Sequence, residues 1–154
     1  MTKKSLVLAT LFLITFPSCS LNYSSINSGT KRMEDYQIVN DNQIQWSDVL
    51  KQNDDNYLVF IYSETCSNCH DIQQEVIDFA IDRIVETYFI DTKKSGDVTI
   101  SKDIEPTIGA SDMENVSILG TPTILEVENK TIKANVPGKD SILSLLNEKR
   151  FSKK

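Results

Sequence analysis

The chain has 154 residues, of which 40% are hydrophobic and 25% are charged, and its formal net charge is −6. This length and composition fit one globular domain with a modest core, and they exclude two domains or a disordered acidic chain. The acidic balance also disfavours nucleic acid as a partner, because phosphate binding relies on clustered Lys and Arg side chains.

The first eighteen residues have the pattern of a secretion signal. Lys3 and Lys4 form a positively charged N-terminal region, residues 6–16 are apolar, and the small residue Ser18 ends the segment. The apolar stretch is shorter than the roughly 20 residues that a membrane-spanning helix needs, so we expect residues 1–18 to be removed after export. The mature chain then carries fourteen basic and twenty-two acidic residues, a formal charge of −8.

The sequence Phe16-Pro17-Ser18-Cys19 resembles a bacterial lipobox, in which the cysteine is lipidated after cleavage and becomes the new N-terminus. This resemblance implies a lipoprotein-type signal and a lipid anchor at Cys19 on the extracytoplasmic face of the cell membrane. The alternative is ordinary signal cleavage, which would leave a secreted protein with a free thiol. Residues 19–35 are rich in Ser and Asn and lack apolar periodicity, which predicts a flexible tether.

The folded domain is predicted to span residues 36–150. Residues 36–44 are expected to form a strand and residues 46–52 a short helix. Residues 58–62 are apolar on both faces, which is typical of a central strand covered on two sides by helices. From residue 69 to residue 83, apolar side chains recur at three- and four-residue spacing, which predicts a helix with one buried stripe.

Three further strands and one helix are predicted in the second half of the chain. The strands are expected at residues 85–90, 118–127 and 131–136. The last helix is expected to begin with Asp140 or Ser141 as its N-cap. Residues 91–97 are expected to be a charged, solvated turn. Pro106 and Gly109 exclude a long helix in residues 98–115, whose structure the pattern leaves open. This order of elements predicts an α/β sandwich with a mixed central sheet.

A Cys-x-x-Cys pair, Cys66 and Cys69, follows the predicted central strand and opens the predicted long helix. Two thiols on the first turn of a helix lie within bonding reach of each other. The unpaired N–H groups and the positive dipole end of the helix favour the thiolate form of the first cysteine. We therefore expect Cys66 to attack a substrate disulfide and Cys69 to resolve the mixed disulfide.

Two other kinds of site use closely spaced cysteines. A zinc site needs a second Cys or His pair, and only His70 remains for that purpose. The sequence from Cys66 to His70 also matches the pattern of c-type haem attachment, with Met33 and Met113 as candidates for a second axial ligand. A haem pocket closed by a proline loop is hard to build beside a core strand. We therefore expect no metal and no cofactor other than a redox-active disulfide.

The order strand, Cys-x-x-Cys, helix, then Thr121-Pro122-Thr123 before a hairpin, then Val136-Pro137-Gly138 before a last helix, resembles the thioredoxin family. The resemblance implies an α/β thioredoxin-like fold, with a mixed central sheet flanked by helices. In that family the proline is cis and lies against the cysteine pair. The resemblance therefore places Pro122 beside Cys66 and gives the backbone of Thr121 a role in binding an extended substrate.

The chain departs from the family pattern at two places. Thioredoxins proper have a buried acid on the strand before the cysteines, whereas the matching position here is Phe60. This departure makes Glu64 a candidate for proton transfer with Cys69. Ser67 and Asn68 form the active-site dipeptide, which tunes the redox potential in this family, so the direction of electron flow does not follow from the resemblance. In its compact size the chain is similar to bacteriocin transport accessory proteins.

The sequence thus predicts an extracytoplasmic, membrane-anchored thiol-disulfide oxidoreductase. Its expected partners are exported polypeptides and a membrane redox partner, and we expect a monomer. The alternative is a non-catalytic accessory module, in which the scaffold presents Thr121 and Pro122 to an exported peptide or a transporter. In that case the two cysteines serve only as a local staple.

Overall fold

The computed structural model describes residue 33 and residues 35–152. The predicted signal, Cys19 and most of the tether lie outside these residues. A four-stranded sheet in the order β2-β1-β3-β4 forms the centre of the described part. Its strands are β1 (Asn56–Tyr62), β2 (Glu86–Asp91), β3 (Thr123–Glu128) and β4 (Thr131–Pro137). β1 is parallel to β2 and antiparallel to β3, and β3 is antiparallel to β4, so the predicted mixed sheet is confirmed.

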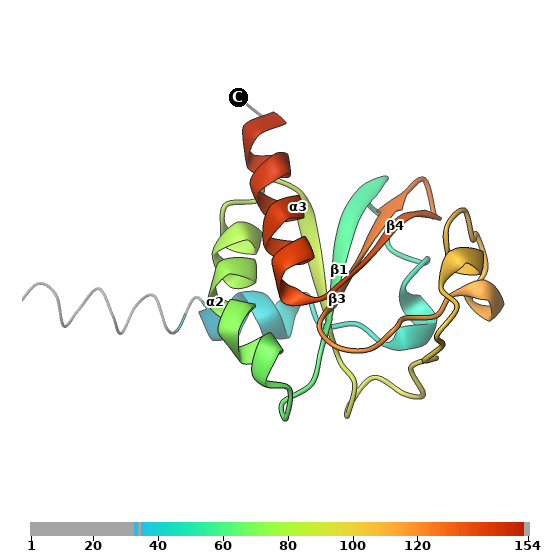
Figure 1. The fold of residues 1–154 in the computed structure, drawn as a ribbon. Helices are drawn as coiled ribbons and strands as arrows, with labels where there is room; N and C mark the ends of the chain where they lie inside the picture. The colour runs from blue at the N-terminus through green and yellow to red at the C-terminus, as the bar shows by residue number, and fades with distance from the viewer. Residues whose placement is uncertain (1–32, 34, 153–154) are drawn as a thin grey trace, which may run out of the picture.

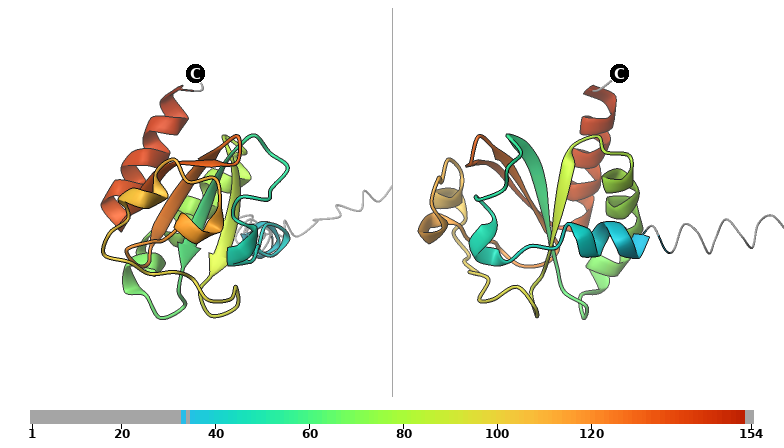
Figure 2. Two further views of the ribbon diagram at one scale, coloured as in Figure 1. Left: turned by 90° about the vertical axis from the view of Figure 1, so that its right-hand side faces the viewer. Right: turned by 180° about the vertical axis from the view of Figure 1, so that it is seen from behind.

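Helices α2 (Ser67–Ile81) and α3 (Lys139–Ser152) lie on the same face of the sheet (Figure 1). The helical residues 35–41, light blue in Figure 2, lie beside α2 and pack Ile38 and Val39 against the same core. Within the described residues, no helix combines the length and apolar character needed to cross a membrane.

The other face of the sheet is covered by short 3₁₀ turns and loops, opposite α2 and α3 in Figure 1. These turns are η1 (Trp46–Asp48), η2 (Glu105–Thr107) and η3 (Met113–Asn115). Pro106 is the second residue of η2, and Gly109 adopts a φ of 84°, a backbone conformation that interrupts a helix. The region whose structure the sequence left open is therefore an irregular second cover of the sheet.

β1 is buried on both faces, as its apolar sequence predicted. Leu58 and Phe60 belong to the core between the sheet and the helices, whereas Val59 and Ile61 belong to the core under the 3₁₀ turns. All four side chains are at most 1% exposed. The prediction of two-sided burial is confirmed, but only one of the two covers consists of regular helices.

The predicted strand at residues 36–44 is wrong. Residues 35–41 are helical, and only Gln43 forms an isolated bridge, with Phe89. The β-branched Ile38 and Val39 favour a strand by propensity, but here their packing against α2 and the sheet selects a helix. Asp35, expected in the tether, is part of this helix and accepts a hydrogen bond from Gln74 Nε2 at 3.2 Å.

The strand expected at residues 118–127 is shorter than predicted. β3 begins at Thr123, and Ile118 instead forms an isolated bridge with Ile100. The intervening residues form the loop that contains the cis peptide bond between Thr121 and Pro122. This loop lies at the end of the sheet where β1 meets α2, which is where the two cysteines are found.

Candidate active site

The two cysteines lie at the junction of β1 and α2. Cys66 is the N-cap of α2 and forms a disulfide with Cys69, with the two Cα atoms 5.2 Å apart. The backbone N–H of Cys69 donates to Cys66 Sγ at 3.1 Å. A sulfur at this position faces the free N–H groups and the positive end of the helix dipole, which stabilise a thiolate in the reduced form.

The two sulfurs differ in accessibility. Cys66 is partly exposed, whereas Cys69 is buried and only 3% exposed. Ser67 and Asn68 between them are exposed on the first turn of α2. An approaching protein therefore meets Cys66 and the dipeptide before it reaches Cys69.

The cis-proline loop lies against Cys66. The Thr121–Pro122 bond is cis, and the carbonyl oxygen of Thr121 lies 3.5 Å from Cys66 Sγ. Gly138 N–H donates to the carbonyl oxygen of Pro122 at 2.9 Å, which holds the loop beside the start of α3. The cis bond and its place beside Cys66 agree with the thioredoxin resemblance. Substrate binding by Thr121 and Pro122 stays a prediction.

Four charged side chains lie beside this site, where β1 and β2 end. Asp91 is fully buried and forms an ion pair with Lys94 at 3.0 Å. Glu64 forms ion pairs with Lys94 at 3.1 Å and with Lys93 at 3.5 Å. The hydrogen bond from Lys94 lowers the pKa of Glu64 below its ordinary value. The turn predicted at residues 91–97 is therefore charged as expected, but its first residue is buried rather than solvated.

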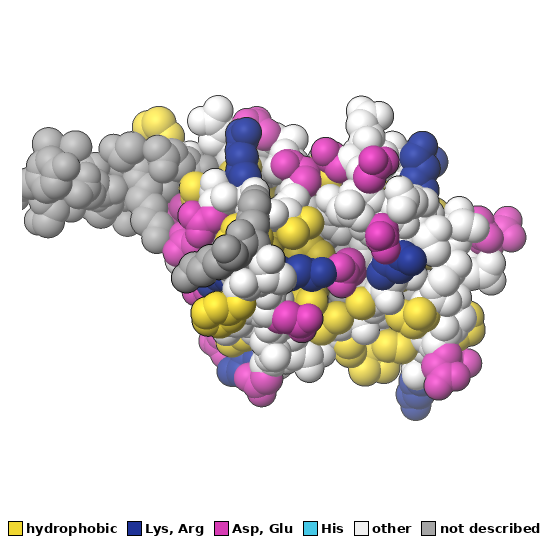
Figure 3. All heavy atoms as spheres, turned by 90° about the horizontal axis from the view of Figure 1, so that it is seen from above, with side chains coloured by type: hydrophobic (Ala, Val, Ile, Leu, Met, Phe, Trp, Pro, Cys, Tyr) yellow, Lys and Arg dark blue, Asp and Glu magenta, His cyan; other side chains and the backbone are white. Residues whose placement is uncertain are grey.

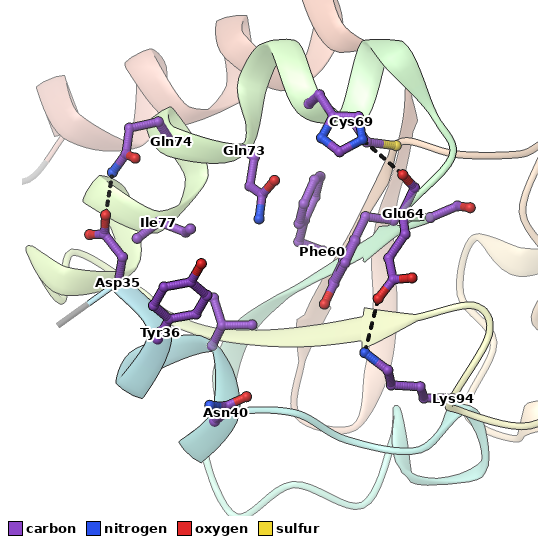
Figure 4. Close-up of a pocket in the computed structure, with 14 residues that line it drawn as sticks. Asp35, Tyr36, Asn40, Phe60, Glu64, Cys69, Gln73, Gln74, Ile77 and Lys94 are labelled. Carbon is purple, nitrogen blue, oxygen red and sulfur yellow. Dashed lines mark hydrogen bonds and ion pairs between the residues drawn. The ribbon is translucent and has the colours of Figure 1, made fainter. Parts of the chain in front are cut away.

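Glu64 contributes to the site through its main chain as well. Its carbonyl oxygen lies 2.8 Å from Nε2 of His70, while its carboxylate is directed towards Lys94 (Figure 4). Proton transfer by the Glu64 carboxylate stays a prediction. Among the described residues, no group of three or more Cys, His, Asp or Glu side chains is arranged to hold a metal ion.

A pocket of about 740 Å³ has Cys69 in its lining. Residues 35–40, the end of β1 and the first turns of α2 form its walls (Figure 4). Phe60, the residue at the place of the family's buried acid, lies in its lining. Sequence reasoning missed this pocket because its walls come from segments that are far apart in the chain.

Comparisons with known proteins found matches only among solved structures. No protein-family model matches the chain, and no curated protein sequence matches it. Solved structures do match. Thioredoxin f2 of Chlamydomonas reinhardtii is 19% identical with a TM-score of 0.47, over 69% of this chain and 93% of that chain. Mitochondrial thioredoxin 3 of Saccharomyces cerevisiae is 17% identical with a TM-score of 0.49, over 74% and 95%.

A further solved structure, which is named for its thioredoxin fold, has a TM-score of 0.50 and 17% identity, over 73% of this chain and 96% of that chain. The fold is thioredoxin-like. The identity is too low to carry more than the fold, so the chemistry of this thioredoxin-like domain has to be argued from its own residues.

The thioredoxin-like fold brings together most of the residues that the sequence singled out. Cys66, Cys69 and the Thr121–Pro122 loop form one site, with Glu64 at its edge. Cys19 lies outside the described residues. The buried Asp91 and the contact of His70 with Glu64 were not predicted. A signal for His70 was available, because it directly follows the second cysteine in the first turn of the helix.

Proposed function

We propose that this protein is an extracytoplasmic thiol-disulfide oxidoreductase that exchanges disulfides with exported polypeptides through Cys66 and Cys69. The observation that carries the proposal is the place of Cys66 Sγ. The sulfur is partly exposed at the start of α2, accepts the N–H of Cys69 and lies 3.5 Å from the cis-proline loop. These are the requirements of a nucleophilic thiolate that must also meet a peptide sulfur.

In the reducing direction, the Cys66 thiolate attacks one sulfur of a substrate disulfide. A mixed disulfide forms, and the other substrate sulfur leaves as a thiolate. The Cys69 thiol then loses its proton and attacks Cys66 Sγ, which releases the second substrate thiolate. The substrate gains two electrons, and the pair becomes the disulfide seen in the structure. The reverse sequence donates that disulfide to a substrate dithiol.

The other residues of the site also have roles in this proposal. Thr121 and Pro122 offer backbone groups to an extended substrate segment, and Ser67 and Asn68 tune the redox potential. A potential measured against glutathione gives the direction of electron flow. A compact domain on the proposed tether, similar to bacteriocin transport accessory proteins, would suit a monomer that works close to the membrane. A membrane redox partner would return the pair to its starting state.

A Cys69→Ser variant tests the catalytic proposal. Without the resolving thiol, mixed disulfides between Cys66 and exported polypeptides should accumulate and be visible as reductant-sensitive adducts on non-reducing gels. The matched control is the Cys66→Ser, Cys69→Ser double variant, which should form none. Absence of adducts that depend on Cys66 would refute the enzymatic role.

The accessory-module alternative predicts a different outcome for the double variant. If the cysteines were only a staple, the double variant would retain full biological activity. The pair closes a loop with a sequence separation of three residues. The chain-entropy model gives so short a loop a stabilisation of only about 2 kcal/mol. Such a small gain favours a catalytic explanation for the adjacent thiols.

A Cys19→Ser variant tests the proposed location. Lipidation at Cys19 would hold the mature chain on the membrane, so the parent protein should sediment with membranes and the variant should not. Immunoblots of membrane and soluble fractions measure this directly. Equal partition of the two proteins would refute a lipid anchor at Cys19, and growth-medium recovery of both would favour the secreted alternative.

A further inference from the structure

Resolution of the mixed disulfide requires Cys69 to lose a proton, because the thiolate is the nucleophile. Cys69 is 3% exposed, and the strand below it offers Phe60 in place of an acid. A thiol in apolar surroundings resists ionisation. The pocket that reaches Cys69 is therefore the place to look for a base.

Several titratable side chains line that pocket together with Cys69. They are Asp35, Tyr36, Tyr62, Glu64, His70 and Lys94. Asp35 and Tyr36 lie at the far end from Cys69 (Figure 4), and Asp35 accepts a hydrogen bond from Gln74. These two groups are too remote to take the proton of Cys69.

Three of the remaining groups are poor bases near neutral pH. The ion pair with Lys94, assisted by Lys93, lowers the pKa of Glu64, so its carboxylate holds a proton weakly. Hydrogen bonds to Asp91 and Glu64 raise the pKa of Lys94, which keeps its ammonium group charged. Burial raises the pKa of Tyr62, which keeps its hydroxyl group neutral.

His70 has the geometry and the chemistry of an acceptor. Its Nε2 lies 2.8 Å from the carbonyl oxygen of Glu64. A carbonyl oxygen only accepts hydrogen bonds, so this contact places the imidazole proton on Nε2 and leaves the lone pair of Nδ1 available. Imidazole is also the side chain that ordinarily exchanges protons between about pH 5 and 8.

We propose that His70 takes up the proton of Cys69 during resolution, through solvent in the pocket, and that the main-chain carbonyl of Glu64 positions the imidazole for this step. The inference rests on the proposed oxidoreductase function. The proton passes from Cys69 Sγ to Nδ1 of His70, the Cys69 thiolate attacks Cys66 Sγ, and the substrate thiolate leaves. The imidazolium then returns its proton to that thiolate or to water, so the step needs no further reactant.

The test separates attack from resolution by using one equivalent of dithiobis(nitrobenzoate) with the reduced full-length chain. The first chromogenic thiolate is released when Cys66 attacks, and the second is released when Cys69 resolves the adduct. All proteins carry Cys19→Ser, so that only two thiols react. Stopped-flow absorbance gives both rates between about pH 6 and 9.5.

His70→Gln is the main variant, because the Gln amide can still donate to Glu64 but cannot take up a proton. At pH 7 we expect the first release to be retained and the second to slow about tenfold, since an ordinary thiol is only a few per cent ionised there. The defect should vanish above about pH 9, where solvent removes the proton directly. A purely structural effect would be independent of pH.

Three controls complete the experiment. Gln73→Asn changes the same pocket wall without removing a base and should match the parent protein. His70→Ala should be slow at pH 7 and recover when imidazole is added to the buffer. Loss of fast resolution in Glu64→Gln but not in His70→Gln would assign the proton to the carboxylate and overturn the proposal.

The proposed function and the proposed role of His70 are refuted by different outcomes. If no first release depends on Cys66, the oxidoreductase function itself is wrong. If the first release is normal and His70→Gln resolves with the parent's rate and pH profile, only the role of His70 is wrong.

Discussion

Thr107 shows how much one polar side chain contributes to the irregular cover of the sheet. It is completely buried, donates its hydroxyl proton to the carbonyl oxygen of Ser117 at 3.0 Å and accepts the N–H of Ser117 at 2.9 Å. The hydroxyl therefore joins η2 to the segment that leads into the cis-proline loop. Backbone groups buried in a loop need such partners, because no ladder or helix satisfies them.

Thr107→Val should lower the free energy of unfolding by about 1–3 kcal/mol, the usual cost of leaving buried polar groups without a partner. Urea titration followed by circular dichroism measures the change. Thr99→Val is the matched control, because the side chain of Thr99 is exposed, and this variant should stay within about 0.5 kcal/mol of the parent. Equal stability of Thr107→Val and the parent would show that the hydroxyl is not needed.

At the scale of elements, α3 is joined to the rest of the domain by apolar and ionic contacts. Ile142 and Leu146, one turn apart, are fully buried against the core. Near its C-terminal end, Lys149 forms an ion pair with Glu126 on β3, and Arg150 forms one with Glu75 on α2. Surface ion pairs contribute little to stability, so the two apolar side chains hold the helix. Because Gly138 precedes α3 and binds Pro122, the position of this helix also affects the cis-proline loop.

Leu146→Ala should destabilise the protein by about 2–5 kcal/mol, because it removes a fully buried side chain and leaves a cavity. Thermal or urea unfolding measures the loss. Ser144→Ala, on the exposed side of the same helix, serves as the control and should change stability by less than about 0.5 kcal/mol. A small effect of Leu146→Ala would mean that α3 is not packed as described.

At the scale of the whole molecule, acidic and basic side chains are interspersed on the face that Figure 3 shows. The acidic net charge of the chain is therefore not gathered into a single patch on this face. Among the described residues, the titratable groups with raised pKa values are three tyrosines and two lysines that pair with carboxylates. Deprotonation of these groups affects the stability of the domain in alkaline solution.

The free energy of unfolding should fall as the pH rises past about 10. Burial raises the pKa of Tyr57, Tyr62 and Tyr88 in the folded state. As the pH rises, these hydroxyl groups therefore ionise in the unfolded chain first, which stabilises the unfolded chain relative to the folded one. Lys94 and Lys139, whose pKa values their carboxylate partners raise, act in the same direction. Their contribution is complete below the unfolded pKa and is lost as the pH rises through the folded one.

Urea titrations at about pH 8 and pH 10.5, without reductant, test this expectation. Tyr88→Phe should weaken the alkaline loss, because it removes one of the ionising groups. A free energy of unfolding that does not change between the two pH values would show that the tyrosine hydroxyls are hydrated in the folded state.

Local patterns in the amino-acid sequence were enough to locate β1, α2, β2, β4 and α3 and to identify the cysteine pair. The cis-proline loop followed instead from the resemblance to the thioredoxin family. A continuous apolar run predicts a strand buried on both faces, and a single apolar stripe predicts a helix. The place of Cys66 at the start of α2 follows from adjacency in the chain.

Only the tertiary structure decided the helix at residues 35–41, the burial of Asp91 and the pocket beside Cys69. Ile38 and Val39 favour a strand by themselves, yet packing against α2 makes residues 35–41 helical. The charged residues of segment 91–97 predict a solvated turn, yet the ion pair of Asp91 with Lys94 allows the Asp91 side chain to be completely buried. The pocket beside Cys69 exists because distant segments meet there. Local patterns carry propensity and periodicity, whereas burial, ion pairing and cavities depend on which distant residues meet, and so they appear only in the folded chain.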